Sequence, residues 1–148
     1  NPKEWLCLKR TVRFGETDAA GVVHFLELFR WCHETWEESL EKYGIELQEI
    51  FPTTQINKCQ LDVALPVVHC EANYFHPLYV GDTIYIELNP EIINDSSFIL
   101  RFEFVKNGEK IGTINIKHVS INRITREKCE LSKQIKLWLS ESSLNFCQ

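Results

Sequence analysis

The sequence predicts an α+β domain in which a curled antiparallel sheet of about five strands wraps around one long helix. Two patterns lead to this fold class: a long amphipathic helical stretch near the N-terminus and a series of β-rich stretches after it. Size is a third observation, because 148 residues that are 44% hydrophobic are enough for one core. We therefore expect residues 1–148 to form a single domain.

The first expected element is a strand over residues 5–14, WLCLKRTVRF, in which β-forming residues alternate in part with polar ones. The stretch from Gly15 to Gly21 predicts a break after this strand. The chain is expected to leave the sheet there and to enter the helix.

The helix is expected over the stretch HFLELFRWCHETWEESLEKYG, residues 24–44. On a helical wheel its apolar side chains fall within about 60° of one direction; they are Leu28, Phe29, Cys32, Trp36, Leu40 and Tyr43. The charged side chains on the opposite side are Glu27, Arg30, Glu34, Glu37, Glu38 and Glu41. Gly44 is suited to end the helix. Burying the apolar stripe contributes on the order of 10 kcal/mol before entropy is subtracted, so these aromatic residues are interpreted as core and not as a cofactor site.

After a loop around Phe51 and Pro52, β-forming residues dominate the chain. Strands are expected at residues 60–75, interrupted by Pro66, and at 83–92, 96–107 and 109–123. A turn is expected at residues 80–82, Asn107-Gly108 is a strong hairpin signal, and residues 132–139 favour a short C-terminal helix.

Composition and charge exclude several classes of protein. The sequence has no run of about 18 apolar residues and no pattern of a secretory signal, so no membrane-spanning helix is expected. The six cysteines form no CxxC pair, which is typical of reduced thiols in a cytoplasmic protein. The net charge of −5 argues against nucleic-acid binding. Residues 101–136 nevertheless carry a net charge of +5, which could meet a phosphorylated ligand or could simply solvate the outer faces of strands.

The stretch GETDAAGVVHF, residues 15–25, holds the best candidate for chemistry. Asp18 lies shortly before the helix, whose first N–H groups are unsatisfied and carry partial positive charge. Gly21 allows the backbone to approach a ligand closely. A carboxylate beside free N–H donors suits acyl transfer, because the donors hold a carbonyl oxygen while the carboxylate attacks or activates water. The alternative, given at least equal weight on chemistry alone, is that Asp18 or Thr17 merely caps the helix.

Other polar residues give weaker signals. His24 could orient substrate or water, or could simply be partly buried at the helix start; Glu16 is interpreted as solvated or structural. The remaining histidines show no ligand spacing, so neither a metal site nor a cofactor is expected. The chain also has no GxGxxG and no P-loop, which excludes the usual dinucleotide and nucleoside-triphosphate folds.

Two motifs make the chain similar to a known family. Residues 12–45, VRFGETDAAGVVHFLELFRWCHETWEESLEKYGI, resemble the N-terminal half of hotdog-fold acyl-CoA thioesterases of the 4-hydroxybenzoyl-CoA thioesterase-like family, with the pattern F-G-x-x-D-x-x-G-V-V before a helix. Residues 74–87, YFHPLYVGDTIYIE, resemble the aromatic-x-x-P-x-x-x-G-D turn of that family. The helix sequence is most similar to cyanobacterial-type 1,4-dihydroxy-2-naphthoyl-CoA hydrolases of phylloquinone (vitamin K1) biosynthesis.

The resemblance implies an assembly and a site. Subunits of the family pair edge to edge into dimers, which often join as tetramers, with active sites at the interface. Asp18 would be the nucleophile or general base, the N–H of Phe25 would polarise the thioester carbonyl, and Gly21 and Val22 would line the approach. The phosphates of coenzyme A usually meet basic residues on later strands and loops; the candidates here are Arg123, Arg126 and Lys128.

Three alternatives remain open at this point. Thioesterases associated with the Tol-Pal system share the D-x-x-G-V-V core and prefer other acyl groups. A non-catalytic hotdog module could bind acyl-CoA without turnover, although such a module has no evident need for a carboxylate near the thioester. A hotdog dehydratase or hydratase would place its acid differently.

Overall fold

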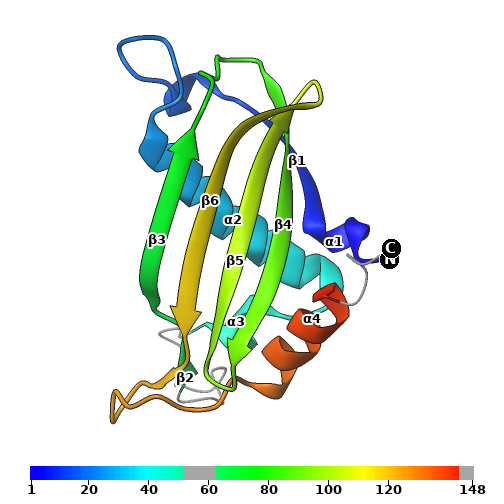
Figure 1. The fold of residues 1–148 in the computed structure, drawn as a ribbon, viewed down its shortest axis with the longest axis vertical. Coiled ribbons are helices and arrows are strands. Elements are labelled where there is room, and N and C mark those ends of the chain that lie inside the picture. Colours follow the sequence, from blue (N-terminus) through cyan, green and yellow to red (C-terminus); the bar gives the residue numbers. More distant parts are fainter. Residues whose placement is uncertain (52–62, 144–148) are drawn as a thin grey trace.

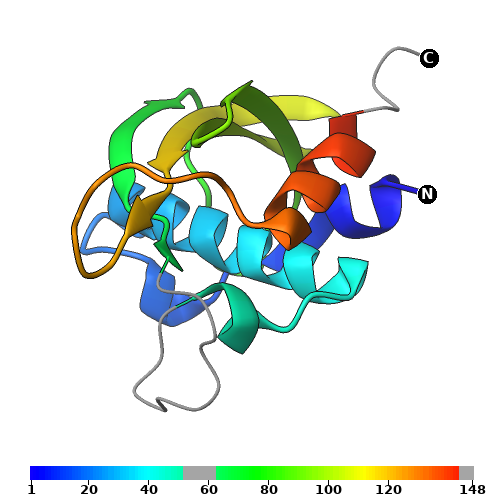
Figure 2. The same ribbon diagram turned by 90° about the horizontal axis from the view of Figure 1, so that it is seen from below.

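The long helix α2 (Phe25–Tyr43) lies against the concave face of a five-stranded antiparallel sheet with the strand order β1-β4-β5-β6-β3 (Figure 1). The computed structural model describes residues 1–51 and 63–143. The strands are β1 (Cys7–Thr11), β3 (Val67–Tyr74), β4 (Thr83–Asn94), β5 (Ser97–Lys106) and β6 (Glu109–Val119). Seen from below, the sheet curves over α2 (Figure 2). The predicted fold class is therefore confirmed.

Helix α2 buries the predicted stripe. Leu28, Cys32, Trp36 and Leu40 are at most 2% exposed, and they join inward-facing residues of β4, β5 and β6 in one core. Gly44 ends the helix with a φ of 114°, and its N–H donates to the carbonyls of Leu40 and Glu41. The left-handed conformation that glycine adopts at low cost therefore stops the helix where the sequence predicts.

The predicted strand over residues 5–14 is wrong at both ends. Its first residues belong to a short helix α1 (Lys3–Leu6), and its last residue opens the 3₁₀ turn η1 (Phe14–Glu16). Trp5 explains the first difference, because its Nε1–H donates to Ser142 Oγ at 2.9 Å and its ring packs edge-on against Tyr43 at 5.2 Å. These contacts dock the N-terminus on α2 and on α4 (Lys133–Ser143), which is longer than the predicted 132–139 helix.

The later strands follow the prediction with two changes. The interruption at Pro66 separates β3 from β2 (Val63–Ala64), and residues 60–62 of the predicted strand lie outside the described residues. The predicted strand 109–123 is divided into β6 and β7 (Ile121–Asn122), and β7 pairs with β2 in a separate two-stranded ribbon. Residues 107 and 108 have φ values of 51° and 75°, as the predicted Asn-Gly hairpin requires. A short helix, α3 (Leu47–Ile50), lies in the predicted loop before Phe51.

Strand β3 forms one edge of the sheet and is open along its length. It pairs with β6 on one side, and its other side meets no strand in the part of the chain that the structure describes. Every residue of β3 is exposed except Tyr74, which is partly buried. The side chains of Val67 and Val68 expose 42% and 54% of their surface. This edge therefore offers unpaired backbone groups beside apolar side chains.

No helix within residues 1–51 and 63–143 is long and apolar enough to cross a membrane.

Candidate active site

The loop between η1 and α2 is a closed turn around Asp18. An antiparallel bridge between Thr17 and Val23 joins its two ends. Within it, the Asp18 N–H donates to the Val22 carbonyl at 2.9 Å, and the Gly21 N–H donates to the Asp18 carbonyl at 3.0 Å. Gly21 has a φ of 80°, which a residue with a side chain rarely adopts. The glycine is therefore required by the backbone conformation of the turn.

The carboxylate of Asp18 is exposed and oriented by its own turn. Its Oδ1 accepts the Ala20 N–H at 2.8 Å, while Oδ2 has no partner among the described residues. Neither Asp18 nor Thr17 caps the helix, so the capping interpretation of these residues is wrong. Thr17 instead donates its hydroxyl to the Phe14 carbonyl at 2.7 Å. One carboxylate oxygen thus remains available for chemistry.

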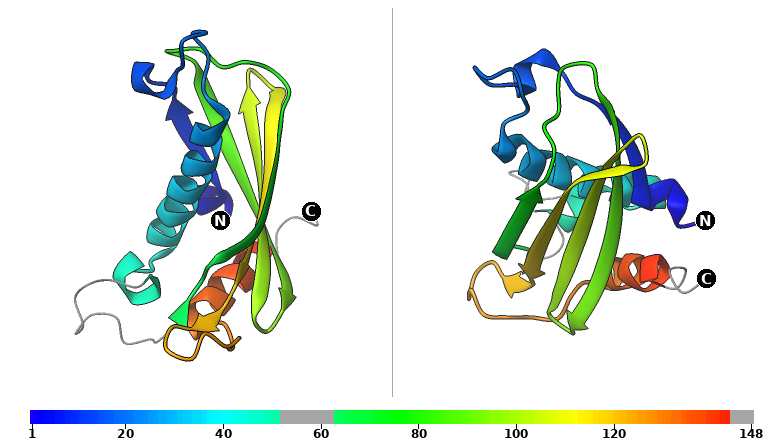
Figure 3. Two further views of the ribbon diagram at one scale, coloured as in Figure 1. Left: turned by 90° about the vertical axis from the view of Figure 1, so that its left-hand side faces the viewer. Right: turned by 45° about the horizontal axis from the view of Figure 1, so that its top comes forward.

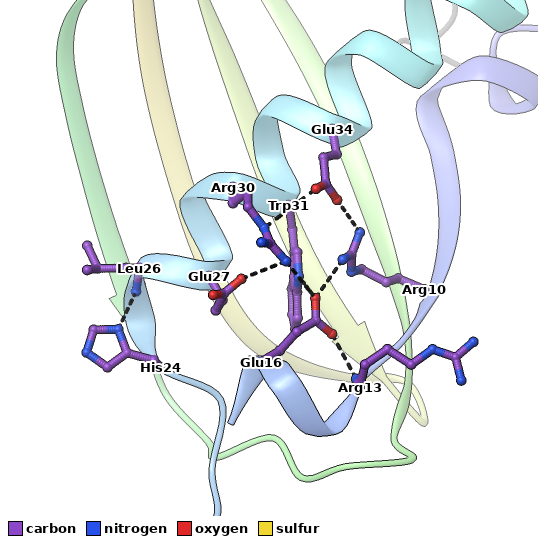
Figure 4. A network of polar contacts seen from close by, with 9 residues as sticks. All are labelled: Arg10, Arg13, Glu16, His24, Leu26, Glu27, Arg30, Trp31 and Glu34. Carbon is purple, nitrogen blue, oxygen red and sulfur yellow. Dashed lines mark hydrogen bonds and ion pairs between the residues drawn. The ribbon is translucent and has the colours of Figure 1, made fainter. Parts of the chain in front are cut away.

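His24 is the N-cap residue of α2. Its Nδ1 accepts the Leu26 N–H at 3.2 Å (Figure 4). Its ring also stacks on Phe25, with 4.7 Å between the ring centroids. Because Nδ1 is the acceptor, the proton of the neutral ring lies on Nε2, which can donate to another group. His24 therefore orders the helix start and presents one further donor.

The first N–H groups of α2 are the candidate oxyanion donors. The Leu26 N–H goes to His24 Nδ1 and the Glu27 N–H to the His24 carbonyl, whereas the Phe25 N–H has no acceptor among the described residues. A free N–H at a helix N-terminus attracts negative charge that develops on a carbonyl oxygen. The closed turn connects this donor to Asp18 through a few residues, with Gly21 exposed and Val22 partly buried between them.

A second loop supports the turn from the sheet side. The Val23 N–H donates to the Leu78 carbonyl at 2.9 Å, and the Leu78 N–H donates to Tyr74 Oη at 2.8 Å. Burial raises the pKa of Tyr74, the Leu78 N–H opposes that shift, and negative charge on nearby groups, including Asp18, adds to it. Tyr74 is the aromatic residue of the aromatic-x-x-P motif, which is the one signal in the sequence that points to this contact.

Glu16, two residues before Asp18, is 5% exposed and fully hydrogen-bonded. It accepts from Arg10 Nη2 and Trp31 Nε1 at 2.6 Å each and from the Arg13 N–H at 2.8 Å (Figure 4). Arg30 Nη2 lies 3.4 Å away. Burial by itself raises the pKa of Glu16, but the hydrogen bonds from Arg10, Arg13 and Trp31 hold the pKa below its usual value. Of the two interpretations of Glu16, the structural one holds and the solvated one is wrong.

The three basic candidates lie far from Asp18 in the single chain. Arg123, Arg126 and Lys128 are exposed on the loop that follows β7. Asn122 Oδ1 shapes this loop by accepting the Ile124 and Thr125 N–H groups at 2.8 and 3.0 Å. Figure 3 shows the loop at one end of the sheet and the Asp18 turn at the other. One chain therefore does not bring the basic residues and the carboxylate together.

Across residues 1–51 and 63–143, no three His, Cys, Asp or Glu side chains are grouped in a way that could hold a metal ion.

Comparisons with known proteins show the family of this chain. Residues 12–139 match the family described as the thioesterase-like superfamily. A 1,4-dihydroxy-2-naphthoyl-CoA hydrolase of Prochlorococcus marinus strain NATL1A is 83% identical over 146 residues, which cover 99% of this chain and 97% of the relative. The enzyme of the same name from Synechococcus sp. strain CC9311 is 48% identical and covers 95% and 92% of the two chains.

Solved structures lead to the same group. The crystal structure of a protein from P. marinus MIT 9313 matches with a TM-score of 0.92 at 48% identity, over 96% of this chain and 99% of that one. A 1,4-dihydroxy-2-naphthoyl-CoA thioesterase from Synechocystis matches with a TM-score of 0.83 at 26% identity, over 92% and 96% of the two chains.

Proposed function

We propose that this chain, which belongs to the thioesterase-like superfamily, hydrolyses 1,4-dihydroxy-2-naphthoyl-CoA to 1,4-dihydroxy-2-naphthoate and CoA. The resemblance to hotdog-fold acyl-CoA thioesterases in the sequence is confirmed by the family match. The observation that carries the assignment is the closed turn that holds an exposed carboxylate a few residues before an unpaired helix-start N–H, in a chain 83% identical to a hydrolase of this name. The reaction is a step of phylloquinone biosynthesis, and we place it in the cytoplasm, in line with the four free cysteines among the described residues.

Asp18 carries the chemistry in one of two roles. As a nucleophile, its free oxygen bonds to the thioester carbon, the C–S bond breaks, CoA leaves as the thiolate, and water then cleaves the acyl anhydride. As a general base, the carboxylate takes a proton from the water that attacks the same carbon. In both roles the Phe25 N–H stabilises the oxyanion, and Nε2–H of His24 supplies a second donor for the bound substrate.

The assembly that completes the site is a homodimer through β3. This edge has a free row of backbone groups and exposed Val67 and Val68, which makes it a template for another strand. Two copies related by a two-fold axis present the same edge to each other, so their β3 strands run antiparallel. Two such dimers can join as a tetramer.

This pairing brings the basic loop to the carboxylate. The Val67 end of β3 lies beside β7 and the loop with Arg123, Arg126 and Lys128, and the Tyr74 end lies beside the Asp18 turn (Figure 1). Antiparallel pairing sets the Val67 end of one strand next to the Tyr74 end of the other. The basic loop of one subunit then approaches the Asp18 turn of its partner, where it can bind the phosphates of coenzyme A.

The experiment is a free-thiol release assay over a panel of acyl-CoA esters, with Asp18→Ala beside the wild type. The panel contains the 1,4-dihydroxy-2-naphthoyl, benzoyl, 4-hydroxybenzoyl and short and long aliphatic esters. We expect selective release from the naphthoyl ester, reduced by about 10³-fold in kcat in the variant. Preference for an aliphatic ester would overturn the substrate, and full activity of a folded Asp18→Ala variant would overturn the role of Asp18.

A further inference from the structure

We propose that Glu16 is a positioning residue, whose buried carboxylate fixes the Asp18 turn and the start of α2 in their reactive arrangement. This inference rests on the proposed thioesterase function, because it concerns how the same site is held. Asp18 itself has only its own turn around it, so the geometry of the reaction must be fixed from outside that turn.

The side chain of Glu16 connects three segments of the chain. Arg10 belongs to β1, Trp31 belongs to α2, and Arg13 opens the 3₁₀ turn that leads to Asp18. Figure 4 shows the carboxylate between these groups, below the second turn of the helix. The one carboxylate therefore ties the strand before the turn to the helix after it.

The backbone of Glu16 also contacts the far end of the Asp18 turn. Its carbonyl accepts the His24 N–H at 3.3 Å, and the next residue, Thr17, bridges to Val23. Both ends of the Asp18 turn are consequently attached to Glu16 or to its neighbour. A displacement of Glu16 would move the carboxylate of Asp18 and the Phe25 N–H relative to a bound thioester.

The contacts require a carboxylate and not merely a polar side chain. One oxygen accepts from the Arg13 N–H, and the other accepts from Arg10 and Trp31, so every close neighbour is a donor. A glutamine carries an NH₂ in place of one oxygen and would set a donor against a donor on one side. Glu16→Gln thus disturbs the hydrogen bonds of this side chain, which we call the Glu16 anchor, while keeping the size of the side chain.

Glu34 offers a matched control, because it binds the same arginine, Arg10. The guanidinium of Arg10 lies 4.8 Å from the centre of the Trp31 ring, and its Nη1 donates to Glu34 Oε2 at 2.5 Å. Glu34 is a second carboxylate on the same arginine, but it lies on α2 and contacts no residue of the Asp18 turn. Glu34→Gln therefore removes one negative charge from the same network and leaves the Glu16 side chain itself unchanged.

The test compares wild type, Glu16→Gln and Glu34→Gln well below their melting temperatures. Because a misplacement of about 1 Å can cost about 10²-fold in rate, we expect Glu16→Gln to lower kcat by about 10- to 100-fold with KM within about twofold. Glu34→Gln is expected to retain kcat within about twofold. Equal losses in both variants, or a change in KM alone, would overturn the proposal.

A second readout does not depend on the substrate. Hydrogen–deuterium exchange of residues 17–24 is expected to rise in Glu16→Gln and to stay unchanged in Glu34→Gln, because only the first variant releases the turn. If Glu16→Gln fails to fold, Arg10→Lys takes its place, since it keeps the charge and loses the second arm of the guanidinium. Unchanged exchange in the turn would overturn the proposal even if the naphthoyl ester proves to be the wrong substrate.

Discussion

Glu16 and Asp18 are two residues apart and carry the same functional group, yet they lie in opposite surroundings. Glu16 is 5% exposed and accepts hydrogen bonds from two side chains and one backbone N–H at 2.6 to 2.8 Å. Asp18 is exposed and accepts one N–H from its own turn. The first carboxylate has its hydrogen-bonding capacity used in holding the structure, whereas the second keeps a free oxygen.

The difference follows from what surrounds each residue in the chain. The 3₁₀ turn Phe14–Glu16 directs Glu16 toward Arg10 and Trp31, which bury it. Beyond Thr17 the chain turns on Ala19, Ala20 and Gly21, which offer N–H groups but have almost no side chain to cover a carboxylate. A buried, hydrogen-bonded carboxylate that fixes the backbone beside an exposed carboxylate is an arrangement that supports preorganised chemistry.

The largest expected effect is a loss of kcat on substitution of the exposed carboxylate, Asp18. Asp18→Asn keeps the shape of the side chain but removes the nucleophile or base, so kcat should fall by about 10³-fold. Steady-state kinetics with the naphthoyl ester measures this loss. The midpoint of urea unfolding should stay the same, because Asp18 contacts only its own turn. A large loss of stability would show that Asp18 is an anchor as well and would remove the contrast with Glu16.

Substitution of the buried carboxylate, Glu16, is expected to lower the stability of the fold. Glu16→Ala leaves Arg10 and the Trp31 N–H without their shared acceptor, which should lower the free energy of unfolding by about 3 kcal/mol. Urea denaturation followed by circular dichroism gives this number, with Asp18→Ala as the control that should stay within about 0.5 kcal/mol of wild type. Similar values for the two variants would contradict the division into anchor and reagent.

Acid should weaken the anchor in a defined pH window. The pKa of Glu16 is held below its usual value despite burial, chiefly by the Arg10, Arg13 and Trp31 hydrogen bonds. The unfolded chain therefore binds this proton at a higher pH than the folded one. The contribution of Glu16 to stability is complete above the unfolded pKa of about 4.3 and is lost as the pH falls through the lower folded pKa. The stability difference between wild type and Glu16→Gln should narrow below about pH 4.3 in urea titrations.

His118 provides an internal control for that titration. Burial lowers its pKa to about 4, the Leu65 carbonyl opposes the shift, and the charge of His33 adds to it. Because the unfolded histidine titrates near pH 6.5, His118 removes stability as the pH falls from about 6.5 to about 4. This loss is common to wild type and Glu16→Gln and cancels in their difference. A difference that changed between about pH 6.5 and 5.5, above the window in which Glu16 itself titrates, would show that the two groups are coupled.

The sequence predicts those parts of the fold and site that depend on local pattern. The period of Leu28, Trp36 and Leu40 predicts the buried face of α2, and Asn107-Gly108 predicts the hairpin. Trp31 lies outside the predicted stripe and is nevertheless fully buried, because its ring joins the core beside Phe104 while its Nε1–H donates to Glu16. Such contacts between distant segments leave no periodic signal.

The prediction of the candidate site is limited in the same way to residues that lie close together in sequence. Asp18, Gly21 and the helix start are close in sequence; the structure places Asp18 and Gly21 in one closed turn, and α2 begins shortly after it. Arg123, Arg126 and Lys128 are candidates because of the family resemblance and their positive charge, and one chain holds them at the far end of the sheet. In the proposed dimer their approach to a carboxylate depends on pairing between subunits, which no local pattern encodes.

The smallest expected effect concerns the second support of the turn. Tyr74→Phe removes only the oxygen that accepts the Leu78 N–H, and Leu78 in turn accepts the Val23 N–H. One net hydrogen bond is worth about 1 kcal/mol, so the free energy of unfolding should fall by about that amount. The kcat should fall about threefold to tenfold, less than in Glu16→Gln, because Tyr74 reaches the turn through an intermediate residue whereas Glu16 is attached to it directly. Stopped-flow or steady-state thiol release on both variants ranks the two supports, and a greater loss in Tyr74→Phe would make the sheet-side loop, not the buried carboxylate, the main anchor of Asp18.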